Sequence, residues 1–97
     1  MLDKDGYPTD KILVEIENYD CTNGINELMD LVESIWYFGD WGYTREEDSW
    51  ELHTGGWSGN ESIISALMDN RLFWMIYWRK SERGGHYWFD LSRYNKK

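Results

Sequence analysis

The sequence has few of the residues on which covalent and metal-based chemistry is usually built. Cys21 is the only cysteine among 97 residues, so no intrachain disulfide can form. A single cysteine also cannot assemble a zinc cluster or a redox pair. This scarcity is typical of a protein from a reducing, intracellular compartment, and we therefore expect a cytoplasmic location.

Long apolar runs are missing as well. The first ten residues, MLDKDGYPTD, are acidic and lack the apolar core of a signal peptide. No apolar run approaches the roughly 18 residues that a membrane span needs, and the longest, LFWMIYW at residues 72–78, suits a strand. We expect a soluble chain with no membrane partner.

Histidine is equally scarce. The chain has two histidines, His53 and His86. Together with Glu51 and Asp90 they could form a metal site or an acid–base pair. Their spacing of 33 residues matches no metal-ligand pattern, and no Ser, His and Asp set forms a recognisable nucleophile motif. The sequence therefore predicts a protein that is not an enzyme, with no catalytic residue, no metal ligand and no cofactor.

Basic residues are few, and they are unevenly placed. The formal net charge is −8, which opposes binding to a nucleic-acid duplex because the attraction to phosphate is reversed in sign. Residues 1–51 hold 14 acidic and 3 basic side chains, a net of −11, whereas residues 52–97 hold 4 and 7, a net of +3. The length allows one domain only, over residues 1–97.

Aromatic side chains, in contrast, are abundant. Seven Trp, seven Tyr and three Phe make up 18% of the chain. One small core cannot cover all of these rings, so some should lie at a surface that binds something. Surplus apolar surface of this kind favours a homodimer.

Three parts of the chain have the spacing of strands. They are residues 12–16, the hairpin 41–54 with residues 45–48 at its tip, and the pair 71–80 and 86–92 joined by the loop SERGG. Gly84 and Gly85 in that loop are free to take a positive φ.

Two segments have the spacing of helices. Apolar residues from Ile25 to Trp36 recur at i, i+3, i+4 and i+7, and residues 61–70 form the second segment. The expected end signals are Thr22 or Asn23 and Gly39 for the first helix, and a Ser58 to Glu61 capping box for the second. The order of elements predicts an α+β fold, with a mostly antiparallel sheet of four to five strands and two helices packed on one face.

The stretch WELHTGGWSGNESII at residues 50–64 combines three features of a ligand site at a strand-to-helix turn. Its glycines let the backbone approach a ligand, the helix start favours an anion, and Trp57 can stack on a flat ring. The spacing matches neither GxxxxGK[ST] nor GxGxxG. The alternative is therefore a purely structural tight turn in which the Trp57 side chain fills part of the core.

A second segment, WRKSERGGHYWF at residues 78–89, interleaves basic and aromatic side chains. Such groups suit a nucleotide, which needs charge for its phosphate and a flat face for its base. The alternative is a hairpin with a solvated, charged tip and aromatic cross-strand pairs. Together the two segments predict a ligand site made of His53, Gly55, Gly56, Trp57, Ser58, Gly59, Asn60, Arg79, Arg83 and His86.

The segments WELHTGGWSGNESIISAL and SERGGHYWFDL together resemble small uncharacterised proteins of phage and prophage genomes. The likeness covers roughly residues 50–91 and none of the N-terminal half. It implies a phage origin. Small acidic phage proteins of this class include some that sequester nucleotide signals and others that mimic DNA to block host defence proteins.

We therefore expect a non-enzymatic protein that sequesters a small anionic ligand, a nucleotide signal, in the host cell and so counters host defence. The alternative is a protein–protein inhibitor whose acidic first half occupies the nucleic-acid-binding groove of a host protein. The same carboxylates can also be no more than a solvated face.

Overall fold

The computed structural model describes residue 4 and residues 6–37 and 42–92, and over these ranges the chain is α+β, as predicted. Its elements are the helix α1 (Asp10–Glu17), the 3₁₀ helix η1 (Cys21–Asn23), the helix α2 (Asn26–Ile35), the strands β1 (Tyr43–Arg45) and β2 (Ser49–His53), the helices α4 (Ser58–Asp69) and α5 (Arg71–Tyr77), and the strands β3 (Trp78–Glu82) and β4 (His86–Asp90).

The sheet is antiparallel throughout, with its four strands in the order β1-β2-β4-β3. Two local hairpins, β1–β2 and β3–β4, supply the strands, and the pairing of β2 with β4 joins the hairpins. In that pairing Trp50 lies opposite Phe89 and His53 lies opposite His86. The predicted hairpin 41–54 is thus confirmed over β1 and β2, with its tip at residues 46–48.

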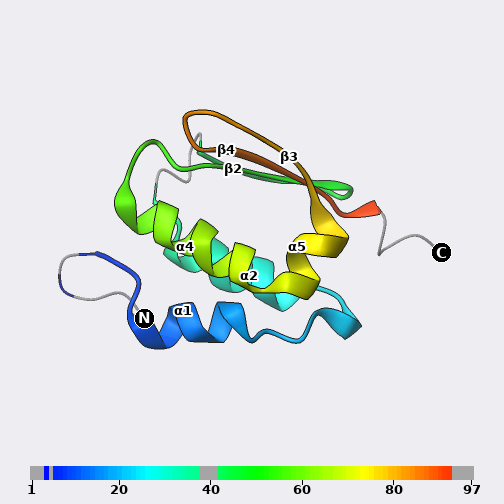
Figure 1. The fold of residues 1–97 in the computed structure, drawn as a ribbon, viewed down its shortest axis with the longest axis horizontal. Coiled ribbons are helices and arrows are strands. Elements are labelled where there is room, and N and C mark those ends of the chain that lie inside the picture. The colour runs from blue at the N-terminus through cyan, green and yellow to red at the C-terminus, as the bar shows by residue number, and fades with distance from the viewer. Residues whose placement is uncertain (1–3, 5, 38–41, 93–97) are drawn as a thin grey trace.

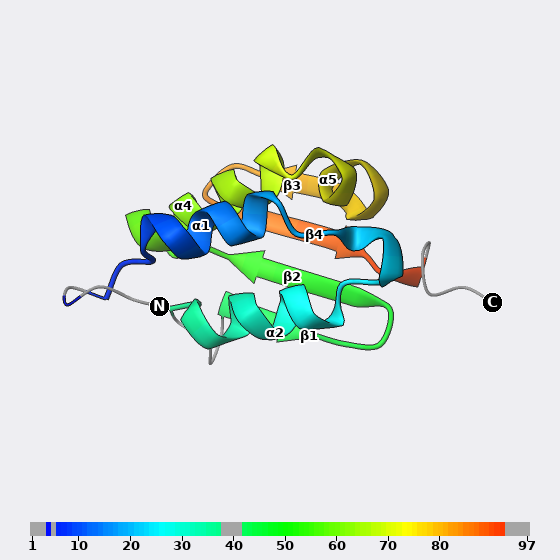
Figure 2. The same cartoon turned by 90° about the horizontal axis from the view of Figure 1, so that it is seen from below.

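The α-helices lie on one side of the sheet (Figures 1 and 2). Helices α2, α4 and α5 form the layer next to the strands, and α1 lies outside them against α4. Trp50, Leu52 and Phe89 point into the core between the sheet and the helices and are buried. Side chains that alternate with them along β2 and β4 occupy the opposite, open face of the sheet. The described chain contains four α-helices where two were predicted.

The first predicted strand, residues 12–16, is wrong, because this segment is helix α1. Thr9 caps the helix by accepting a hydrogen bond from the Ile12 N–H at 3.3 Å. Ile12 and Ile16 are buried, whereas Val14 between them is 49% exposed. Ile12 and Ile16 are four residues apart, so they lie on the same face of a helix as well as on the same face of a strand. In the structure they form the buried face of α1.

The predicted strand 71–80 is also wrong over its first seven residues, which form helix α5. The Asn70 side chain caps this helix by accepting from the Phe73 N–H at 3.1 Å. Phe73 and Tyr77 are buried one turn apart, and Met75 on the other side is 75% exposed. The aromatic content of this segment favours a strand, but the Asn70 cap and the burial of Phe73 and Tyr77 stabilise a helix.

Helix α2 confirms the predicted apolar stripe, with Leu28, Met29, Val32 and Ile35 buried. Its predicted cap is wrong. Thr22 and Asn23 belong to η1, where Asp20 accepts from the Thr22 N–H, and α2 starts after Ile25 without a side-chain cap. The helix ends at Ile35, and Gly39, its expected end signal, lies outside the described residues.

Helix α4 starts three residues before the predicted segment 61–70. Trp57 occupies the N-cap position without a side-chain cap, and Ser58 is already helical, so the predicted capping box does not form. The Ser58 hydroxyl instead donates to the Tyr7 hydroxyl at 3.0 Å. Every helix within the described ranges is too short or too polar to cross a membrane.

Candidate functional site: the glycine end of the sheet

The pairing of β2 with β4 brings the two segments singled out in the sequence side by side. His53 lies opposite His86, and the Thr54 N–H donates to the Gly85 carbonyl at 2.9 Å. The turn that follows β2 therefore lies beside the loop that joins β3 and β4. We call residues 53–56 and 83–86, which meet here, the glycine end of the sheet.

Four glycines of the glycine end have positive φ angles: Gly55 (65°), Gly56 (77°), Gly84 (89°) and Gly85 (84°). These left-handed conformations are ones that other L-residues rarely adopt. At Gly85 a Cβ would also collide with the Thr54 hydroxyl, whereas the space around Gly56 is open. The two turns thus meet where the Thr54 side chain packs against the Gly85 backbone, and the Thr54 hydroxyl also accepts from the Gly56 N–H at 3.3 Å.

Asn60, one of the predicted ligand residues, has a structural role. Its side chain is fully buried, accepts from the Tyr37 N–H at 3.0 Å, and donates to the carbonyls of Tyr37 at 3.0 Å and Thr54 at 3.2 Å. These bonds tie the segment after α2 to the end of β2 and the start of α4. At Gly59 a Cβ would collide with the Trp57 ring, so that glycine is a packing requirement.

Trp57 lies half-buried among aromatic neighbours. Its ring centroid is 4.9 Å from that of Tyr7 and 5.0 Å from that of Tyr37. A ligand ring that stacked on Trp57 would have to compete with these contacts. Trp57 and Ser58 therefore anchor the N-terminal segment to the start of α4, through Tyr7.

The two predicted arginines lie far apart along the same hairpin. Arg83 is exposed in the β3–β4 loop, at the glycine end. Arg79 is exposed near the start of β3, where the pairing with β4 shifts register between Trp78 and Lys80. The structure thus places Arg83 with the glycine turns and Arg79 at the α5 end of the strand.

The two histidines are in direct contact on the open face of the sheet. Their Nδ1 atoms share a hydrogen bond at 2.8 Å, with the donor set by the tautomers, and the Nε2 atom of His53 is 3.5 Å from a carboxylate oxygen of Glu51. The Trp88 ring meets the His53 ring edge-on at 5.6 Å. The spacing of 33 residues conceals this contact, because it depends on the register of two strands from different hairpins. The available signal is local: each histidine adjoins a Gly-Gly turn.

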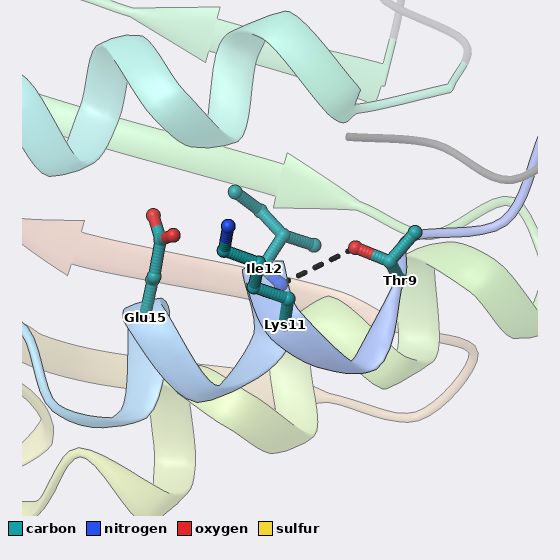
Figure 3. Close-up of a pocket in the computed structure, with 4 residues that line it drawn as sticks. All are labelled: Thr9, Lys11, Ile12 and Glu15. Atoms are coloured by element: carbon teal, nitrogen blue, oxygen red, sulfur yellow. Dashed lines mark hydrogen bonds between the residues drawn. The ribbon is translucent and has the colours of Figure 1, made fainter.

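Three hollows on the described surface lie elsewhere. The first, of about 390 Å³, is lined by residues of the first turns of α1 (Figure 3): Thr9, Lys11, Ile12 and Glu15. The second, about 420 Å³, is lined by Tyr19, Gly24, Asn26 and Glu27, and the third, about 260 Å³, by Met68, Arg71, Trp74 and Met75. In the first hollow Thr9 already caps α1. None of the three is lined by a residue of the predicted ligand site.

The uneven charge of the sequence becomes a separation in space. Exposed carboxylates of α2 and of the β1–β2 loop form what we call the acidic edge: Glu27, Asp30, Glu33, Glu46, Glu47 and Asp48. Arg45 of β1 joins the two parts through ion pairs with Asp30 at 2.6 Å and Glu33 at 3.4 Å. Strand β3, at the opposite edge of the sheet, exposes Arg79 and Lys80.

Comparisons of the chain with protein-family models, with curated proteins and with solved structures find no match in any of the three.

Proposed function

We propose that the chain is a non-enzymatic binding protein whose glycine end holds a small anion, the phosphate of a nucleotide. One observation carries the proposal: the β2–β4 register sets two glycine turns and the exposed Arg83 beside each other, although they are distant in the sequence. Glycine turns admit a ligand close to the backbone, and backbone N–H groups in such turns favour anions.

Arg83 supplies the charge in this arrangement. A guanidinium can pair with two phosphate oxygens at once, which gives both attraction and orientation. Arg79 lies at the other end of β3 and is left out of the proposed site. The stacking expected of Trp57 is left out too, because Tyr7 and Tyr37 already contact its ring.

The biological part of the proposal rests on the resemblance to phage proteins. In that setting the chain acts in the cytoplasm of a host cell, removes a nucleotide signal and thereby counters host defence. A homodimer is part of the proposal, and the exposed apolar side chains near the α4–α5 junction support it as the surface that a second copy covers. They are Met68, Leu72, Met75 and Trp78.

Thermal unfolding in the presence of phosphate and of mono-, di- and cyclic nucleotides tests the ligand. At ten times Kd a bound ligand adds about 1.4 kcal/mol, a rise in Tm of roughly 5–10 °C for a domain of this size. Arg83→Ala should lose this rise. Arg79→Ala, which removes the same charge from the same hairpin, should keep it. Native mass spectrometry of the tag-free protein reports the oligomer and any retained ligand together.

Three results would count against the ligand proposal. They are the absence of a shift with the whole panel, an equal loss in both arginine variants, and conversion of the nucleotide during prolonged incubation. The last would indicate an enzyme.

The acidic edge favours a second candidate function, that of an inhibitor of a nucleic-acid-binding protein. Its carboxylates are exposed and of one sign, and they extend over two neighbouring elements, α2 and the β1–β2 loop. Such a surface can take the place of phosphates in a basic groove.

The triple variant Glu27→Lys, Glu46→Lys, Glu47→Lys tests this function without touching the carboxylates that bind Arg45. If the acidic edge is the interface, the variant should lose capture of a basic nucleic-acid-binding protein from host lysate, and DNA should compete with the wild-type chain. The control is Glu61→Lys with Asp69→Lys, which reverses exposed carboxylates on α4. Equal capture by wild type, triple variant and control would contradict the inhibitor function.

A further inference from the structure

We propose that His53 and His86 together bind one divalent transition-metal ion through their Nδ1 atoms. The two imidazoles come from adjacent strands, β2 and β4, and share the open face of the sheet. His53 and His86 belong to the glycine end, but the inference does not depend on the anion site, because it uses their imidazole nitrogens, whereas the anion site uses Arg83 and the backbone of the glycine turns.

The distance between the two nitrogens is the first argument. Metal–imidazole bonds of about 2.0–2.1 Å put two ligand nitrogens about 2.8–3.0 Å apart when they are cis at 90°, and about 3.3–3.4 Å apart at a tetrahedral angle. The observed Nδ1–Nδ1 distance is 2.8 Å, and in the metal-free chain one ring donates a hydrogen bond to the other across it. An ion bound to both Nδ1 atoms replaces this hydrogen bond, and the donor ring then carries its proton on Nε2 instead. The pair is therefore spaced for a square-planar or octahedral ion such as Cu²⁺ or Ni²⁺, whereas tetrahedral Zn²⁺ would require the rings to move apart.

The second argument is the environment of His53. Histidines that bind a metal usually donate their other ring N–H to a carboxylate or carbonyl, which fixes the tautomer and the ring orientation. The Nε2 atom of His53 is 3.5 Å from the Glu51 carboxylate, while its Nδ1 atom faces His86. The His53 side chain is only 17% exposed, so its orientation is held by packing. One nitrogen is thus oriented toward a carboxylate and the other toward the second ligand.

The charged side chains nearest the pair carry a net negative charge. Glu51 lies on the His53 side, and Glu82 lies opposite His86 in the β3–β4 register. Lys80 approaches from β3, but its ammonium lies 4.5 Å over the Trp88 ring and 3.6 Å from Glu82. A cation between the histidines therefore meets one ammonium and two carboxylates on this face.

The site is a two-ligand site. Over the described ranges no group of three or more His, Cys, Asp or Glu side chains is placed to hold a metal ion. Water completes the coordination, so the ion exchanges readily and its affinity is below that of structural sites with four protein ligands.

Cu²⁺ is the sharpest probe because it is the divalent first-row ion that nitrogen ligands bind most tightly. The tag-free chain has only two histidines, so removal of the tag leaves no other imidazole to confuse a titration. Isothermal titration should give one Cu²⁺ per chain, and electron paramagnetic resonance should show two equivalent imidazole nitrogens. Ni²⁺ should also bind, without redox chemistry.

Matched variants identify the ligands and the carboxylate behind His53. His53→Gln and His86→Gln should each abolish saturable binding at metal concentrations that half-saturate the wild type. Glu51→Gln should keep the stoichiometry and weaken binding about tenfold, since loss of a carboxylate behind a ligating histidine typically costs 10–100-fold in affinity. Glu82→Gln, on the neighbouring strand, should change binding less than Glu51→Gln. Thermal unfolding of each variant without metal checks that it folds.

Failure to bind one ion, a spectrum with one nitrogen or none, or unchanged binding in either histidine variant would overturn the inference. The nucleotide experiments are run in EDTA, so a positive result there and a negative one here remain distinguishable.

Discussion

At residue 85 no side chain larger than a hydrogen atom fits between the two turns of the glycine end. A Cβ there would meet the Thr54 hydroxyl, and the φ angle of 84° would disfavour any other L-residue even in open space. Gly56 also has a positive φ, 77°, but the space around it is open. Comparing substitutions at these two glycines therefore distinguishes the cost of backbone strain from the cost of the steric contact.

Gly56→Ala should lower the free energy of unfolding by about 1–2 kcal/mol, the cost of a left-handed non-glycine residue. Gly85→Ala should lower it by about 1–3 kcal/mol more, because Thr54 has to move as well. Urea denaturation of the two variants measures the difference. Equal values would show that the Thr54–Gly85 contact relaxes without cost.

At the level of residues, the structure brings some of the predicted ligand residues together and uses others in packing and hydrogen bonds. Arg83, His53 and His86 meet at one end of the sheet because β2 and β4 pair. Asn60 is occupied by three hydrogen bonds to backbone, which no local pattern reveals. The partners of Asn60 lie up to 23 residues away, so the role of its amide follows only from tertiary structure.

At the level of elements, helices with a repeating apolar face could be predicted and short ones could not. Helix α2 buries four residues over ten, a pattern that only a helix explains. Helix α1 has eight residues and α5 has seven, and over such lengths two buried residues four apart also fit a strand. The first hairpin was predicted from alternating side chains, and the loop SERGG marked the second, although its first predicted strand, 71–80, is helical as far as Tyr77.

Asn70 shows why the short helices still form. Its side chain caps α5 through the Phe73 N–H and donates to the carbonyls of Ile16 at 2.9 Å and Tyr19 at 3.0 Å, just before and after the end of α1. A single buried amide thus holds the end of one helix and the start of another. Such a link joins residues up to 54 apart and leaves no trace in local periodicity.

At the level of the whole molecule, the buried Cys21 thiol and the partly buried Tyr43 hydroxyl make the fold sensitive to alkaline pH. Burial, and secondarily the charge of Asp20, raises the pKa of the Cys21 thiol from 9.0 to about 11. Burial likewise raises the pKa of Tyr43 from 10.0 to about 12, and the Tyr43 hydroxyl donates to the Met29 carbonyl. At a pH between the ordinary and the raised pKa of each group, the folded chain keeps a proton that the unfolded chain has released.

Stability should therefore be constant with respect to Cys21 below about pH 9 and fall between pH 9 and about 11, where only the unfolded chain loses the thiol proton. The urea midpoint measured across this range checks the sign. Cys21→Ala should show a shallower fall, with the Tyr43 contribution remaining toward pH 12. A fall of equal steepness in that variant would contradict the role of Cys21.

The separation of charge along the sequence is retained in the folded molecule, with the acidic edge near β1 and basic side chains on β3. The uneven charge can be counted in the sequence, but its placement at opposite edges of the sheet follows from the strand order β1-β2-β4-β3, which the sequence did not predict. The prediction of helices packed on one face already implied a free second face of the sheet, and the structure places four α-helices rather than two on the covered side.

The seam between β2 and β4 also has a consequence for the order in which the protein is made and completed. Each hairpin closes over a few residues, but the seam joins His53 to a residue 33 positions later. Closing a larger loop costs more chain entropy, so we expect the seam to form after the two hairpins. The glycine end and the histidine pair are built on this seam, and a chain truncated before β4 lacks both.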